Sequence, residues 1–173
     1  IGPKTAQAVS RYHFLQTPKV IISGAVGTHR DSEKDSDLHI ELTAPHFHWF
    51  KFNLTNAVAH LDWVTNQLSI TNLQADFYGG TLAGDLTFDF DPPVGNDFTF
   101  DLGYTNAGLR PLIADLSNPT NRLEGRVTGD VHLTSANTAY WDSWQGHGNL
   151  MLTNGLLWDI PVFGIVSPLM NGI

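Results

Sequence analysis

Apolar and polar residues alternate along much of the chain. Between Leu82 and Phe90, every second residue is apolar or glycine, and the residues between them are mainly polar. A period of two is typical of a β-strand that turns one face to a core and the other to water. The same alternation occurs over Leu38–Leu42, Phe98–Tyr104, Leu123–Leu133 and Gly146–Leu152. The pattern predicts a mainly β protein built on an antiparallel sheet.

Turn signals separate several of these runs. Gly79-Gly80 predicts a hairpin, residues 92–95 (Pro-Pro-Val-Gly) predict a turn, and Asn66 marks another between two apolar runs. Lys19–Gly27 is predicted to be extended, and His29–Asp37 to be a polar loop. Bulky residues occupy both faces over His46–Leu54. This stretch is therefore predicted to be one strand that is covered on both sides.

Helical spacing appears in three short places. We expect helices over residues 3–14, over Gly108–Leu116 and from Asp159 onward. In the second, Leu109, Leu112, Ile113 and Leu116 follow the i, i+3, i+4, i+7 rule. Asp159 is suited to an N-cap, and Pro168 is expected to kink or stop the third helix. Two or three short amphipathic helices are thus predicted beside the sheet.

Two segments, Tyr78–Phe88 and Leu123–Leu133, are nearly alike. Their glycines and one aspartate coincide, and Gly148–Leu152 is a shorter echo. Four glycines fall in the apolar register of the predicted strands: Gly84, Gly125, Gly129 and Gly148. Glycine inside a strand marks a bend, a bulge or a close approach. These glycines indicate either sheet curvature with close packing, or a concave apolar surface that leaves room for a ligand chain.

Composition narrows the classes of function. The net charge is −8 with only nine Lys and Arg, which argues against nucleic acid and against docking to anionic lipid headgroups. The absence of cysteine excludes thiol catalysis, thiolate metal sites and disulfides. We expect one domain over residues 1–173, without a cofactor. Because the chain begins without Met and ends on an apolar segment, we interpret it as an excerpt of a longer protein.

Candidate chemical sites are weak. His46 and His48 would share one face of a strand, but no third metal ligand stands at a recognisable spacing. Asp31, Glu33, Asp35 and Asp37 lack the glycine and glutamate of a calcium-binding EF loop, so a solvated loop is preferred. The carboxylates available for glycoside hydrolysis all occupy polar strand positions: Asp85, Asp89, Asp101 and Asp130. We therefore expect no metal site and no enzyme.

The C-terminal third resembles the AsmA-like C-terminal region of bacterial envelope proteins of the AsmA/TamB type. That region ends in a pattern close to G-x-G-x-L-x-L-x-N-G-x-L-W-x-x-P-V-F-G, and here Gly146–Gly164 reads GHGNLMLTNGLLWDIPVFG. The strands around Gly84 and Gly129 are similar to the repeating units of that family, and Leu109–Leu116 is similar to its short inserted helix. The resemblance extends over roughly residues 67–173.

The resemblance implies a curved sheet that forms a groove or taco-like half-barrel. It also implies a periplasmic protein of a Gram-negative bacterium, held at the inner membrane by an anchor outside this chain, with an outer-membrane partner. Such proteins are thought to conduct phospholipid, with acyl chains in the groove. The floor would be lined by Leu82, Leu86, Phe88, Phe98, Phe100, Val127, Val131, Leu150 and Leu152. The alternative is a structural cap or partner-docking domain with a closed core.

Overall fold

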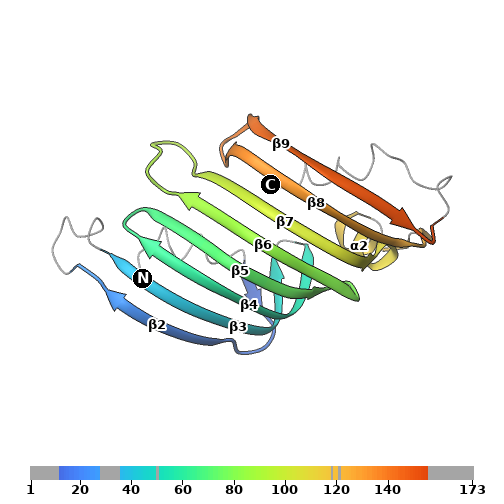
Figure 1. The fold of residues 1–173 in the computed structure, drawn as a ribbon, viewed down its shortest axis with the longest axis horizontal. Coiled ribbons are helices and arrows are strands. Elements are labelled where there is room, and N and C mark those ends of the chain that lie inside the picture. The colour runs from blue at the N-terminus through green and yellow to red at the C-terminus, as the bar shows by residue number, and fades with distance from the viewer. Residues whose placement is uncertain (1–11, 28–35, 50, 118, 121, 156–173) are drawn as a thin grey trace.

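A computed structural model describes residues 12–27, 36–49, 51–117, 119–120 and 122–155 (Figure 1). Within these residues, nine strands form a single sheet in which every pairing is antiparallel. They are β1 (Tyr12–Phe14), β2 (Lys19–Ala25), β3 (Asp37–Trp49), β4 (Phe52–Val64), β5 (Gln67–Phe77), β6 (Gly80–Asp89), β7 (Asp97–Gly108), β8 (Arg126–Asn137) and β9 (Tyr140–Thr153). The prediction of a mainly β, antiparallel protein is confirmed.

Among the described residues, the sheet is a meander whose two edges pair with no further strand. From β3 to β9 each strand pairs with the next one in sequence, while β1 and β2 pair with successive stretches of β3. Figure 1 shows β2 and β9 at opposite edges of the sheet. Since these two edge strands do not pair with each other, the sheet is not a closed barrel.

Two-residue turns join β5 to β6 and β4 to β5. Tyr78 and Gly79 both have positive φ, at 49° and 76°, as a two-residue hairpin turn requires. A similar tight connection lies at Thr65-Asn66. The prediction of one strand over His46–Leu54 is wrong, because β3 ends at Trp49 and β4 begins at Phe52. The bulky residues on both faces of that stretch belong to two paired strands.

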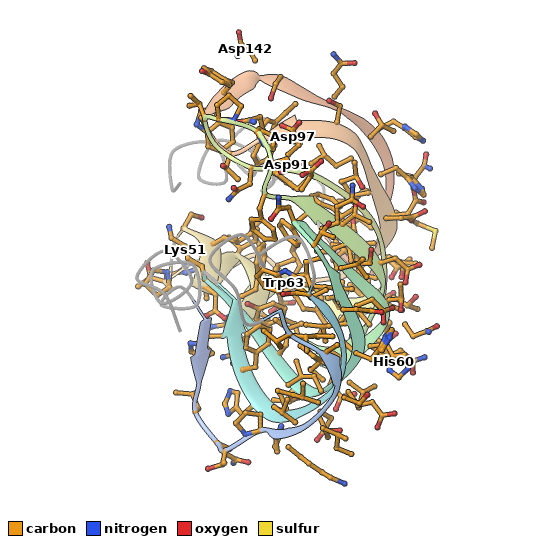
Figure 2. All side chains as sticks on the ribbon, turned by 90° about the vertical axis from the view of Figure 1, so that its left-hand side faces the viewer. Lys51, His60, Trp63, Asp91, Asp97 and Asp142 are labelled. Carbon is orange, nitrogen blue, oxygen red and sulfur yellow. The ribbon has the colours of Figure 1, made fainter. Side chains whose placement is uncertain are left out.

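Three asparagines mark places where the strand register shifts. Asn56, Asn72 and Asn106 have φ of 51°, 54° and 55°, and each lies at a break in the ladder of β4, β5 or β7. Such β-bulges bend a strand and increase its twist. Asparagine accepts the left-handed conformation more readily than other non-glycine residues. These bulges help to curl the sheet that Figure 2 shows in end view.

The two faces of the curled sheet differ in polarity. The concave face carries the apolar register, including Leu54, Leu86 and Leu102, and Trp63 points into it (Figure 2). The convex face carries the polar register, and His60 points outward from it (Figure 2). This division is what the alternating sequence predicts.

In the described part of the chain, one helix, α2 (Leu109–Leu116), packs on the concave face. Its buried side chains Leu109, Ile113 and Leu116 join a core cluster supplied by β3 to β8. The ammonium group of Lys51 donates a hydrogen bond of 3.0 Å to the carbonyl oxygen of Leu116 at the end of the helix. The prediction of a helix over Gly108–Leu116 is confirmed to within one residue.

The other predicted helices fare differently. The prediction of a helix over residues 3–14 is wrong for its last three residues, because Tyr12–Phe14 form β1 and pair with Phe47–Trp49. Residues 3–11 and the helix from Asp159 lie outside the described residues. Among the described residues, no helix is long and apolar enough to cross a membrane.

Candidate functional site

The predicted floor residues all lie on the concave face, but protein covers them unequally. Leu82, Leu86 and Val127 are buried, and Leu82 and Val127 belong to the core cluster beneath α2. Phe88, Phe98, Phe100 and Leu152 are half-buried. Val131 is 39% exposed and Leu150 is 65% exposed. Open apolar surface therefore lies toward the β9 edge of the concave face.

The helix closes one end of the concave face, which we call the helix end. Several hydrogen bonds fix it there. Tyr78 donates its hydroxyl hydrogen to Asp115 of α2 at 2.7 Å and accepts from the backbone N–H of Asn53 at 3.1 Å. Burial, followed by the hydrogen bond to Asp115, raises the pKa of Tyr78 well above its ordinary value. Next to the helix, Arg126 of β8 donates to the carbonyl oxygens of Gly79 and Asn106, which ties β8 to the β5–β6 turn and to β7.

Aromatic side chains line the opposite end, which we call the aromatic end. Ring centroids are 5.3 Å apart for Trp63 and Phe90, 5.2 Å for Phe98 and Trp144, and 4.5 Å for Trp141 and Trp144. The complete aromatic band consists of Trp63, Phe88, Phe90, Phe98, Phe100, Trp141 and Trp144. Sequence reasoning found three of these residues and missed the others, because they come from strand ends whose alignment depends on the register.

The loops at the aromatic end are held by Asn137. Its side-chain nitrogen donates to Asp97 at 2.6 Å and to the carbonyl oxygen of Val94 at 3.2 Å. Its backbone carbonyl oxygen accepts the indole N–H of Trp144 at 3.1 Å. The Asn137 side chain is only 9% exposed, so these bonds satisfy a buried polar group. They fix the position of Trp144 in the aromatic band.

The four glycines in the apolar register lie where neighbouring backbones approach closely. A Cβ atom at Gly84 would stand 1.9 Å from the carbonyl oxygen of Asp101, and one at Gly129 would stand 2.1 Å from that of Asn149. At Gly148 the nearest atom would be the Asp130 carbonyl oxygen at 2.5 Å, and at Gly125 the Gly155 Cα at 2.9 Å. Close packing explains all four glycines, and none opens onto empty space for a ligand.

The candidate carboxylates lie on the convex face and have structural partners. Asp85 accepts the backbone N–H of Asn72 at 2.8 Å, which satisfies the bulge on β5. Asp101 and Asp130 each lie 3.0 Å from a different ring nitrogen of His132. Asp89 is paired with Asp97 in the strand register and accepts the backbone N–H of Asp91 at 2.9 Å. Asp85 and Asp101 stand directly opposite each other in the register of β6 and β7.

A shallow hollow of about 350 Å³ lies on this convex side. Its polar lining includes Asp85, Thr87, Asp101, His132 and Thr134. Within this lining, Asp85 accepts a backbone N–H, and one ring nitrogen of His132 lies 3.0 Å from Asp101.

The predicted histidine pair does share one face of β3. The His46 and His48 ring centroids are 5.6 Å apart, and Nε2 of His46 lies 2.7 Å from Oδ1 of Asn53. In the described part of the chain, no three His, Cys, Asp or Glu side chains are grouped to hold a metal ion. Of the calcium-loop candidates only Asp37 is described, and it lies 3.4 Å from His39. The other three lie outside the described residues.

Comparison of the chain with protein-family models, with curated proteins and with solved structures finds no match.

Proposed function

We propose that this chain is a non-enzymatic module that binds phospholipid acyl chains along its concave face. As in the AsmA-like proteins that it resembles, the curled sheet would act as a groove that conducts lipid between the inner and outer membranes. The cellular setting is the periplasm, with an inner-membrane anchor outside this chain and an outer-membrane partner. The groove would serve outer-membrane biogenesis.

The observation that supports this most is apolar surface left open on the concave face. Val131 and Leu150 are exposed there toward the β9 edge, and the aromatic band farther along the same face is mostly half-buried. Burying a leucine or valine side chain completely stabilises a complex by about 1.5–3 kcal/mol. Since about two thirds of Leu150 is exposed, a covering acyl chain would gain roughly 1–2 kcal/mol at this residue alone.

Two adjacent residues of β9 provide a matched test. Leu150 lies on the concave face and Met151 on the convex face, and both are well exposed, at 65% and 57%. We expect Leu150→Asp to weaken the binding of a nitroxide-labelled zwitterionic phospholipid about tenfold or more, because the acyl chain would meet a carboxylate. Met151→Asp should leave binding within about twofold. Equal effects of the two variants would contradict lipid binding on the concave face.

A second candidate is a structural module with a closed core. It is favoured by the burial of Leu86, Leu102 and Leu133, which lie on the concave face outside the core cluster around α2. A module of this kind would take up no lipid, and Leu150→Asp and Met151→Asp would behave alike. The same binding measurement therefore separates the two candidates.

A further inference from the structure

The edge strand β9 is open to further pairing. In the described part of the chain it pairs only with β8, over Arg126–Asn137. Gly146 and Gly148, in its middle, are exposed. Because glycine has no side chain, this exposure is exposure of the backbone. An open backbone edge is complementary to another β-strand, whose N–H and C=O groups it can bond.

The edge also lacks the features that usually block such pairing. Residues 143–153 contain no Asp, Glu, Lys, Arg or Pro. Edge strands that avoid association commonly carry charged residues, above all lysine, or proline. In a chain of net charge −8, an uncharged stretch of this length is suited to meeting a second, identical chain.

The sequence of β9 is complementary to itself when it runs antiparallel about His147. This register places Gly146 opposite Gly148 of the second copy, and Gln145 opposite Asn149. It also places Trp144 opposite Leu150. In these pairs glycine faces glycine, amide faces amide, and an apolar residue faces an apolar residue. Because directly opposite residues share a face, the apolar residues stay on the concave side. The two Asp142 residues would lie at opposite ends of the paired segment, far from each other.

We propose that two copies of this chain associate through antiparallel β9–β9 pairing centred on His147. The dimer is isologous, because the same strand serves both partners. It joins the two sheets edge to edge and makes their concave faces continuous. This association is independent of lipid binding.

Disulfide trapping tests the register, because the chain has no cysteine of its own. In the proposed dimer the two copies of residue 147 face each other directly, within the Cα separation of about 7 Å that a disulfide allows. The two copies of residue 149 are displaced by four residues, or about 13 Å along the strands. We expect His147→Cys to form a disulfide-linked dimer under mild oxidation, and Asn149→Cys to remain largely unlinked.

Because His147→Cys removes the ring contact between His132 and His147, whose centroids are 4.9 Å apart, a second variant that keeps His147 is needed. The double variant Gln145→Cys/Asn149→Cys probes the same register without altering His147. Light scattering of the wild-type chain should give twice its mass of 19.0 kDa. A monomer at all concentrations would overturn the proposal. So would equal cross-linking of the His147→Cys and Asn149→Cys variants, which would indicate random collisions or a different register.

Discussion

Replacement of Gly84 by alanine should be costly although it adds only one methyl group. Gly84 lies on β6 opposite Leu102 of β7, with φ at +155°, where L-residues with a side chain are strained. The new Cβ would stand 1.9 Å from the Asp101 carbonyl oxygen, and real Cβ contacts are not shorter than 3.0 Å. The backbones of β6 and β7 would have to separate locally by about 1 Å.

Two contributions determine the loss of stability that we expect for Gly84→Ala. An unfavourable backbone conformation costs about 1–3 kcal/mol. A separation of about 1 Å weakens one or two ladder hydrogen bonds, which contribute about 0.5–1.5 kcal/mol each. We therefore expect Gly84→Ala to lower the free energy of unfolding by about 2–4 kcal/mol, as measured by urea denaturation.

Gly103→Ala is the matched control. Gly103 lies on β7 next to Leu102, but a Cβ there would meet its nearest atom only at 3.9 Å, and its φ is not in the left-handed region. Alanine should be neutral or stabilise the fold by about 0.5–1 kcal/mol, because glycine in a strand is entropically unfavourable. Equal stability of the two variants would refute the conclusion that close strand approach requires Gly84.

Three further changes test the hydrogen bonds at the two ends of the sheet and on its convex face. Tyr78→Phe should lower the free energy of unfolding by about 1–2 kcal/mol, because Asp115 loses its donor; a calorimetric melt measures this. Asn137→Ala should cost about 2–4 kcal/mol and change the near-UV signal of tryptophan, because the loops at the aromatic end lose their common partner. The hydrogen bond to Asp62, at 2.6 Å, and the charge of Asp37 raise the pKa of His39 above 6.5. The stabilisation of the fold by the His39–Asp62 pair is complete below pH 6.5 and is lost as the pH rises through the raised pKa of His39. The difference in free energy of unfolding between wild type and Asp62→Asn should therefore shrink over that pH range, as measured by urea titrations.

The alternating pattern predicted the sheet and the division of its faces because a strand has a side-chain period of two. It also predicted α2, whose apolar residues have helical spacing. The hairpin between β3 and β4 escaped prediction because residues 50–51, Phe-Lys, include no glycine, proline or asparagine to signal a turn. The bulges at Asn56, Asn72 and Asn106 were not predicted for another reason. A single left-handed residue within a strand leaves the alternation of apolar and polar residues intact on either side, so the sequence pattern gives no sign of the bulge.

The candidate site was predictable in part. The sequence identified residues of the concave face, but not which of them α2 covers, because the helix connects β7 to β8 and packs back over strands distant in sequence. The aromatic band likewise depends on register, which aligns the ends of β4, β6, β7 and β9. Gly84, Gly129 and Gly148 lie within strands, while Gly125 precedes β8, which begins three residues later than the predicted strand at Leu123. The close contacts that require these glycines are visible only in three dimensions.

Native mass spectrometry of the wild-type chain, purified from bacterial membranes under gentle conditions, tests the central claim most directly. We expect the folded protein to carry phospholipid, Leu150→Asp to carry much less, and Met151→Asp to carry the wild-type amount. A folded chain that is free of lipid, and that takes up none from phospholipid vesicles, would contradict it.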